Sequence, residues 1–263
     1  MRTTGRANRL RTTTRDACQR GNNRGVRAST VAILCGGRGT RLREGSESLP
    51  KPLVEIGGRP ILWHVMQIYL VHGCERFLLL TGYRGEMVQE FAGAERWPRS
   101  VEVRCIDTGT DTPTGGRLKR AQDALGSETF FATYADGVAD IDLGALAAFH
   151  ARHGALATMT VVRPHLQFGI ARLDGESRIA GFIEKPRSEQ WINGGFFCFE
   201  PAALDHIEPD SILEREPLER LAVQGQLHGY RHEGFWDCMD TYKDAVMLND
   251  LWRAGRAPWK TWT

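Results

Sequence analysis

Short apolar runs alternate with amphipathic stretches along most of the chain. The runs are continuous in apolar residues and end at glycine or polar positions, as buried parallel strands do. They predict strands at residues 30–35, 76–81, 101–106, 129–134 and 157–162. Apolar residues at helical spacing predict intervening helices at residues 60–72, 86–91, 116–125 and 143–153. Repeated strand–helix units predict an α/β fold with a doubly wound, mostly parallel, Rossmann-like sheet.

After about residue 164 the pattern changes. Shorter runs between turns predict strands at residues 169–173, 179–184 and 194–199, which suit a smaller mixed or antiparallel region. Two closing helices are predicted at residues 217–224 and 242–253. No proline- or serine-rich linker and no internal repeat separates the two regions. We therefore expect one continuous fold with a first lobe of about residues 30–163 and a second lobe of about residues 164–263.

The first 29 residues show no hydrophobic periodicity. Residues 1–30 contain eight arginines and one acidic residue, Asp16, for a charge of +7. The other 233 residues carry −5, because the whole chain carries +2. We interpret residues 1–29 as a disordered basic tail or a misassigned start, with a transit peptide or an RNA-binding arm as the alternative. Since the remainder is mildly acidic, we expect no nucleic-acid partner.

Composition places the chain among soluble globular proteins. Hydrophobic residues make up 41% and charged residues 25% of the chain. No stretch approaches the roughly 18 apolar residues that a membrane helix needs. The tail lacks the apolar segment of a secretory signal. The six cysteines form no C-x-x-C pair and mostly lie in apolar runs, so we expect buried thiols in a cytoplasmic protein with no membrane partner.

Two of the few lysines each precede a proline. Only five of the 34 basic residues are lysine, and Lys51 and Lys185 are both followed directly by proline. Where arginine is the default cation, a lysine beside a rigid proline indicates a site that needs a compact point charge. Chance is the alternative explanation.

A glycine-rich turn follows the first predicted strand, with Gly-Gly-Arg-Gly-Thr-Arg-Leu at residues 36–42. Backbone N–H groups in such a turn can approach phosphate oxygens closely. A Walker P-loop is excluded because the chain has no Gly-Lys pair. A dinucleotide fingerprint would need a third glycine where Leu42 stands. A purely structural turn remains open, but it gives no role to Arg41 or to the Pro-Lys-Pro at residues 50–52.

The turn and the Pro-Lys-Pro together resemble the signature of the sugar-1-phosphate nucleotidylyltransferases. Further runs narrow the resemblance to the members that use CTP and glucose 1-phosphate; they lie at residues 54–58, 61–64, 114–120, 136–140, 184–186, 193–197 and 257–262. The similarity covers residues 31–263. It implies the nucleotide-diphospho-sugar transferase fold, with the first lobe binding the nucleotide and the second the sugar phosphate.

The resemblance also implies the reaction. A phosphate oxygen of the sugar 1-phosphate attacks the α-phosphorus of CTP in line, which yields pyrophosphate and CDP-glucose, a precursor for O-antigen lipopolysaccharide biosynthesis. The attacking phosphate is largely ionised near neutral pH, since its second pKa is about 6, so no protein base is required. Catalysis then depends on positioning and on neutralising charge.

The resemblance assigns roles residue by residue. The expected catalytic residues are Arg41, Lys51, Asp136 and Lys185. The expected nucleotide-binding residues are Leu34, Cys35, Gly36, Gly37, Arg38, Gly39, Thr40, Arg41, Lys51, Thr112, Gly115, Arg117 and Ala135, with Arg117 facing either phosphate or base. The expected sugar-phosphate residues are Gly169, Glu184, Lys185 and Asn193. Asp136 and Asp240 are expected to hold Mg²⁺, which commonly takes few carboxylates and completes its shell with phosphate oxygens and water.

Two departures from the family pattern leave alternatives open. The link between Phe91 and Val101 is short, which bears on the assembly of the expected homo-oligomer. Ala135 stands where the family has glycine, which bears on the choice of base. A uridylyl- or thymidylyltransferase and a catalytically silent sugar-nucleotide-binding protein therefore remain alternatives. A nicotinamide oxidoreductase is disfavoured by the missing third glycine.

Overall fold

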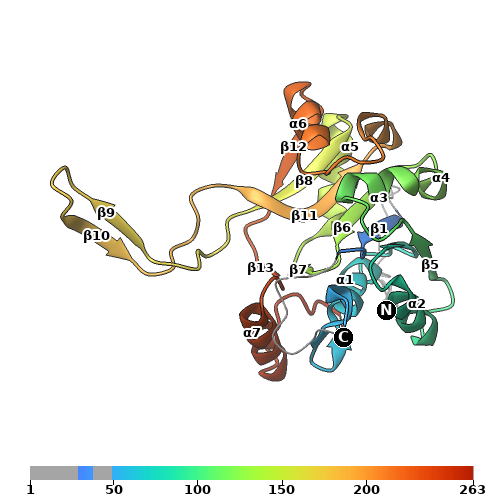
Figure 1. Ribbon diagram of the computed structural model, residues 1–263, viewed down its shortest axis with the longest axis horizontal. Coiled ribbons are helices and arrows are strands. Elements are labelled where there is room, and N and C mark those ends of the chain that lie inside the picture. Colours follow the sequence, from blue (N-terminus) through green and yellow to red (C-terminus); the bar gives the residue numbers. More distant parts are fainter. Residues whose placement is uncertain (1–28, 38–48, 263) are drawn as a thin grey trace, which may run out of the picture.

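Seven strands form the central sheet of the computed structural model, which describes residues 29–37 and 49–262 (Figure 1). Their order is β12-β8-β11-β6-β1-β4-β5. The strands are β1 (Thr30–Leu34), β4 (Arg76–Thr81), β5 (Glu102–Asp107), β6 (Phe130–Tyr134), β8 (Ala157–Val162), β11 (Ile192–Phe199) and β12 (Leu227–Arg231). Only β11 runs antiparallel to its neighbours β6 and β8, while the other pairs are parallel. The predicted mostly parallel α/β sheet is confirmed.

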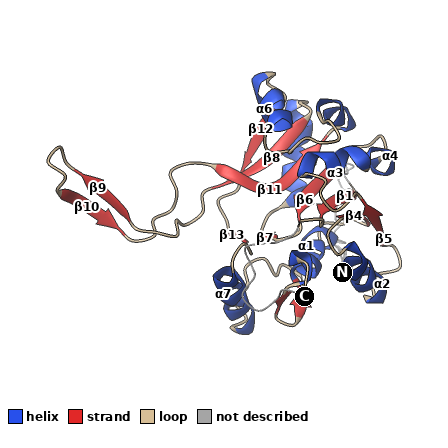
Figure 2. Cartoon of the chain, viewed as in Figure 1, coloured by secondary structure: helices blue, strands red, loops and turns tan. Residues whose placement is uncertain are grey.

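Helices cover both faces of this sheet (Figure 2). One face carries α1 (Ile61–Leu70), α2 (Gly85–Ala94), α5 (Leu143–His153) and α7 (Tyr242–Arg253). The other carries α3 (Thr114–Arg120), α4 (Gln122–Leu125), the 3-10 helix η3 (Pro201–His206) and α6 (Glu216–Val223). Successive β1 residues alternate between the two cores, with Val31 in the first and Ala32 in the second. Burial on both faces explains the continuous apolar runs in the sequence.

Helix ends follow local capping rules. The side chain of Asp142 accepts a hydrogen bond from the Ala145 N–H at the start of α5, and Gly154 ends that helix in the left-handed conformation. Thr241 and Asp244 form a capping box at the start of α7. Both helices have the predicted bounds. The helix predicted over residues 116–125 is instead two helices, because the backbone leaves helical geometry at Ala121.

Several short elements were not predicted. They are the 3-10 helix η2 (Lys51–Leu53) and the strands β2 (Glu55–Ile56), β3 (Arg59–Pro60), β7 (Gly137–Ala139) and β13 (Trp236–Cys238). Strand β12 and the 3-10 helix η3 were not predicted either. The antiparallel pair β7–β13 joins the segment after β6 to the segment before α7. It brings residues 136 and 240 together across the chain.

A two-stranded hairpin projects from the body (Figure 1). It consists of β9 (Ile170–Leu173) and β10 (Ile179–Ile183), which pair with each other and with no other strand of the described chain. We call residues 164–191 the arm. The expected lobe boundary near residue 164 falls at the start of the arm, but β11, β12 and α7 from the expected second lobe pack within the body.

The remaining sequence predictions have partial outcomes. The tail of residues 1–29 and Cys18 lie outside the described residues, apart from Ser29. The other five cysteines are buried at Cys35, Cys74 and Cys198 and half-buried at Cys105 and Cys238. Within residues 29–37 and 49–262, no helix has the length and apolar character needed to cross a membrane.

Candidate active site

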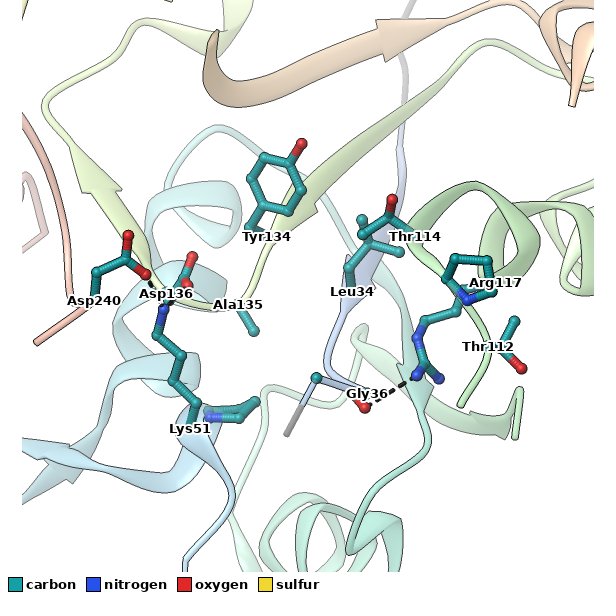
Figure 3. Close-up of a pocket in the computed structure, with 13 residues that line it drawn as sticks. Leu34, Gly36, Lys51, Thr112, Thr114, Arg117, Tyr134, Ala135, Asp136 and Asp240 are labelled. Carbon is teal, nitrogen blue, oxygen red and sulfur yellow. Dashed lines mark hydrogen bonds and ion pairs between the residues drawn. The ribbon is translucent and has the colours of Figure 1, made fainter. Parts of the chain in front are cut away.

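A cavity of about 380 Å³ opens at the carboxyl ends of β1 and β6 (Figure 3). Its lining includes the expected nucleotide-binding residues Leu34, Gly36, Gly37, Thr112 and Ala135. Ligands of doubly wound sheets bind at this edge, because parallel strands place their following loops there. The geometry therefore supports the predicted location of the site.

Lys51 lies between two carboxylates at one end of this cavity (Figure 3). Its ammonium contacts Asp136 and lies 2.5 Å from Oδ1 of Asp240. Burial by itself lowers the pKa of the Lys51 ammonium, but the charge of Asp136 and the hydrogen bonds to both carboxylates outweigh burial and raise that pKa. The side chain of Lys51 is 15% exposed. It is thus a charged, partly desolvated group held at a fixed point.

Local backbone structure fixes each member of this trio. Lys51 begins η2 between Pro50 and Pro52, where the proline rings restrict the backbone. Asp136 lies in the turn between β6 and β7, and its carbonyl accepts a hydrogen bond of 2.9 Å from the Met239 N–H. Asp240 precedes the cap of α7, and its own N–H donates to the Asp244 carboxylate at 3.2 Å. Three distant segments therefore converge on one ammonium group.

Arg117 occupies the opposite wall of the cavity and is bound to the protein itself (Figure 3). Its Nη1 donates to the carbonyls of Thr81 and Gly109 at 2.8 and 2.9 Å, and its Nη2 donates to the Gly36 carbonyl at 3.0 Å. The contact of Arg117 with phosphate or base stays a prediction. In the protein itself the guanidinium joins the ends of β1, β4 and β5.

The same contact explains why residue 36 is glycine. A Cβ at that position would lie 2.0 Å from Cζ of Arg117, a separation that no packed structure tolerates. Any larger residue at position 36 would therefore displace the Arg117 guanidinium. Thr112 also turns inward to the protein, since its hydroxyl donates to the Thr108 carbonyl at 2.5 Å.

Part of the expected nucleotide site cannot be placed. Arg38, Gly39, Thr40 and Arg41 fall at residues 38–48, outside the described residues. Two described residues of the expected set, Cys35 and Gly115, do not line the cavity. Burial raises the pKa of the Cys35 thiol, which suits a core position. Gly115 packs against the 207–213 segment, where a Cβ would lie 2.8 Å from the Ser211 carbonyl oxygen.

Tyr134 is a lining residue that the sequence analysis missed. Its hydroxyl donates to Glu214 and accepts a hydrogen bond of 3.0 Å from Nδ2 of Asn193. Burial, together with the charge of Glu214, raises the pKa of the Tyr134 hydroxyl, so it stays protonated as a donor. Its place at the end of β6, directly before Ala135, was the available signal. Tyr134 connects the nucleotide cavity to the expected sugar residue Asn193.

The other expected sugar-phosphate residues lie on the arm. Gly169 and Glu184 are in close contact, because a Cβ on Gly169 would lie 2.8 Å from Oε2 of Glu184. Lys185 lies beside Glu184, with 3.8 Å between Nζ and Oε1. Asn193 is separate from them, in β11, where its Oδ1 accepts from the Gly195 N–H at 2.8 Å. The structure therefore divides the expected sugar residues between two places.

A larger cavity of about 1130 Å³, which we call the groove, lies between the base of the arm and the start of α7. Lys185 and Asp240 both line it, and Asp240 also lines the nucleotide cavity. Lys185 is not among the residues that line the nucleotide cavity in the described part of the chain. Trp236, which was not predicted, also lines the groove and donates from Nε1 to the Gly194 carbonyl at 2.7 Å.

Asp136 and Asp240 fit a magnesium site, which takes few ligands from protein, better than a metal site whose ligands all come from protein. Asp136 and Asp240 are close enough to share one ammonium. Within the described ranges, no group of three or more His, Cys, Asp or Glu side chains is arranged to hold a metal. Mg²⁺ is usually bound by one or two carboxylates with phosphate oxygens and water. Zinc sites, by contrast, use three or four protein ligands.

Comparisons with known proteins agree with this geometry. A family model described as "Nucleotidyl transferase" matches residues 30–253. A "Probable glucose-1-phosphate cytidylyltransferase" of Bacillus subtilis (strain 168) is 41% identical over 254 residues, covering 88% of this chain and 99% of the relative. The "Glucose-1-phosphate cytidylyltransferase" of Salmonella typhi is 44% identical over 255 residues, with the same two coverages of 88% and 99%.

Among solved structures, the crystal structure of HddC from Yersinia pseudotuberculosis is similar to this chain with a TM-score of 0.69 at 20% sequence identity. The match covers 85% of this chain and 99% of HddC. At that identity the likeness shows the fold alone. It confirms the predicted nucleotide-diphospho-sugar transferase architecture.

Proposed function

The chain belongs to the nucleotidyl transferase family, and from this premise we propose that it transfers the cytidylyl group of CTP to α-D-glucose 1-phosphate. The products are CDP-glucose and pyrophosphate. The observation that carries the proposal is the Lys51 ammonium fixed between Asp136 and Asp240 beside the glycine turn. This arrangement suits a reaction that gathers many phosphate oxygens at one point. The choice of CTP and glucose 1-phosphate as the substrates rests on the names of the two relatives given above.

The chemistry is an in-line displacement at phosphorus. A phosphate oxygen of glucose 1-phosphate forms a bond to the α-phosphorus of CTP as the bond from that phosphorus to the β-bridging oxygen breaks. Pyrophosphate leaves with the bridging oxygen and its electron pair. The attacking oxygen is already ionised near neutral pH, so no side chain has to remove a proton. The protein therefore contributes position and positive charge.

Lys51 is the side chain best placed to neutralise the triphosphate. Its ammonium is charged, partly desolvated and anchored at the cavity wall. A charge in such an environment acts more strongly on a phosphate than one in water. Arg41 is proposed as its partner on the basis of the glycine-turn motif. Lys185, at the base of the arm, is proposed to hold the phosphate of glucose 1-phosphate where the groove meets Asp240.

Asp136 and Asp240 are proposed to hold Mg²⁺. The two carboxylates provide the few hard oxygen ligands that this ion takes from protein. A bound Mg²⁺ supplies further neutralisation of phosphate charge. The Lys51 ammonium pairs with the same two carboxylates and offsets one of their two negative charges, so a divalent cation there would meet a site that is still anionic.

The cellular setting follows as a further proposal. We expect a cytoplasmic enzyme that acts as a homo-oligomer and whose CDP-glucose feeds O-antigen lipopolysaccharide biosynthesis. The free thiols of Cys35, Cys105, Cys198 and Cys238 support a reducing compartment. Exposed apolar side chains on the arm, such as Phe182 at 62% and Leu173 at 60%, support contact with another subunit. Light scattering on the purified full chain would measure the subunit number.

Product analysis tests the activity directly. The full chain is incubated with Mg²⁺, CTP labelled at the α-phosphate, and glucose 1-phosphate. We expect the label in CDP-glucose, in an amount equal to the pyrophosphate released, and no labelled CDP-glucose when glucose 1-phosphate is omitted. Label found in CMP would indicate hydrolysis and contradict the proposal. The absence of any labelled product would favour a sugar-nucleotide-binding protein.

A further inference from the structure

Three charged side chains form an ion-pair network at the base of the arm, which we call the clamp. Arg163 immediately follows β8, where the chain leaves the body, and Arg187 lies where the arm returns. Glu233 lies just beyond the end of β12. Nη2 of Arg163 donates to both carboxylate oxygens of Glu233 at 3.0 Å. Nη1 of Arg187 lies 3.0 Å from Oε2 of the same carboxylate.

Backbone contacts and a ring contact strengthen the clamp. Nε of Arg187 donates to the Arg163 carbonyl at 2.8 Å, and its Nη2 donates to the Glu233 carbonyl at 3.1 Å. The guanidinium of Arg163 lies 4.6 Å from the ring centre of Trp191, the last residue of the arm. Both ends of the arm are therefore attached to one carboxylate. Beyond this point the hairpin projects away from the body (Figure 1).

The clamp lies next to Lys185 along the chain. Lys185 has φ +45°, in the left-handed region that a lysine rarely adopts. Such a conformation persists only where the surroundings enforce it. Nδ1 of His165 donates to the Lys185 carbonyl at 3.2 Å, and the Leu166 N–H donates to the Pro186 carbonyl at 2.9 Å. The Ser188 N–H donates to the Pro164 carbonyl at 2.8 Å.

These pairings make the position of Lys185 depend on the register of the two arm segments. Arg187 is two residues from Lys185, and its bonds to Arg163 and Glu233 fix where that register begins. An isolated two-stranded hairpin has little stability of its own in water. Without the clamp, the arm segments would be free to change their angle to the sheet.

We propose that Glu233 is a positioning residue for the sugar phosphate, which it serves by closing the clamp and so fixing Lys185 at the groove. This rests on the proposed function, since it assumes that Lys185 receives the phosphate of glucose 1-phosphate. Nothing in the family resemblance assigned a role to Glu233, Arg163 or Arg187. The hydrogen bond from Arg163 lowers the pKa of the Glu233 carboxyl, so the carboxylate is ionised at neutral pH.

The consequence is specific to one substrate. Exposed ion pairs contribute little singly, and Glu233 is about half exposed at 52%. The clamp nevertheless joins one carboxylate to two guanidinium groups, and its loss affects a site that must hold a phosphate in place. We expect Glu233→Ala to raise the KM for glucose 1-phosphate about fivefold and to change the KM for CTP by less than about twofold.

Two matched variants sharpen the test. Glu233→Asp keeps the charge and should restore part of the affinity for glucose 1-phosphate. Arg178→Ala removes an ion pair of 2.8 Å with Asp174 near the tip of the same hairpin, and it should leave both KM values unchanged. Hydrogen exchange in the substrate-free protein provides a second readout. Glu233→Ala should speed exchange at the Leu166 and Ser188 amides, whereas Arg178→Ala should not.

The outcomes separate the two proposals. An unchanged KM for glucose 1-phosphate in Glu233→Ala overturns the positioning role. A raised KM with unchanged exchange at Leu166 and Ser188 also overturns it, because Glu233 would then act by direct contact with substrate. If the wild-type chain forms no product from any nucleotide, the proposed function fails. The exchange measurement needs no substrate and still decides whether Glu233 closes the clamp.

Discussion

Removing the Lys51 ammonium should affect both the rate of the reaction and the stability of the protein. In the substrate-free protein this ammonium contacts Asp136 and lies 2.5 Å from Asp240. Carboxylate oxygens that share one ammonium are within about 5 Å of each other, and two unit charges at that distance repel by about 3 kcal/mol at an effective dielectric constant of about 20. The Asp240 side chain is 43% exposed, so solvent reduces the net effect to about 1 kcal/mol.

Lys51→Ala should therefore lower the melting temperature in metal-free buffer by about 2–4 °C, the scale of about 1 kcal/mol for a domain of this size. Mg²⁺ alone should stabilise the variant more than the wild type, because the two carboxylates no longer have an internal cation. Turnover should fall at least about a hundredfold, the scale of one lost stabiliser of transition-state charge.

Scanning calorimetry with and without Mg²⁺, together with pyrophosphate release at saturating substrates, measures both effects. Lys260→Ala is the control, since its ammonium lies 5.3 Å from the Trp252 ring, away from the cavity. Near-normal turnover in Lys51→Ala would refute the assigned role of the ammonium. An equal response of variant and wild type to Mg²⁺ would refute the argument that Lys51 compensates the two carboxylates.

Two further predictions concern Tyr134 and His64. Tyr134→Phe removes the hydroxyl that accepts a hydrogen bond from the Asn193 amide, so the KM for glucose 1-phosphate should rise several-fold while the KM for CTP stays constant. An unchanged KM for glucose 1-phosphate in steady-state assays would contradict this. Tyr242→Phe is the control, because Tyr242 is exposed. Burial lowers the pKa of His64 to about 4 from an ordinary 6.5. Its ring accepts a hydrogen bond from Nε1 of Trp259 and forms another with the Ile56 carbonyl. Unfolding releases a histidine that protonates more readily, so its contribution to stability is intact above pH 6.5. That contribution falls by up to about 1.4 kcal/mol per pH unit between pH 6.5 and 4. Urea unfolding at several pH values should show a weaker acid dependence in His64→Gln than in the wild type or in His72→Gln, and equal dependences would exclude His64 as the source.

Local signals predicted the fold well where a strand or helix is buried in a regular way. The helices at residues 143–153 and 242–253 have the predicted bounds because polar caps and glycine mark their ends. Strand β12 was missed because its sequence, Leu-His-Gly-Tyr-Arg, is half exposed at the sheet edge and has no apolar run. Its place in the sheet depends on pairing with β8, some seventy residues earlier in the chain.

The residues of the candidate site likewise divide into those that local motifs predict and those whose contacts depend on the fold. Lys51, Asp136 and Asp240 were predicted from motifs, and the fold brings them to one point. The bonding of Arg117 to the Thr81, Gly109 and Gly36 carbonyls is not visible in a sequence, because its partners come from three different strand ends. The clamp of Arg163, Arg187 and Glu233 was missed for the same reason. Long-range partners of charged side chains are set by topology, not by local pattern.

Nucleotide preference tests the central claim most directly. Pyrophosphate release by the full chain would be compared for CTP, UTP, dTTP, ATP and GTP, each with Mg²⁺ and glucose 1-phosphate. The account predicts a clear preference for CTP and no release without the sugar phosphate. A preference for UTP or dTTP would keep the displacement mechanism but contradict the base, and the methyl group of Ala135 at the cavity wall would be the first feature to examine. No release with any nucleotide would contradict the claim that this site transfers a nucleotidyl group.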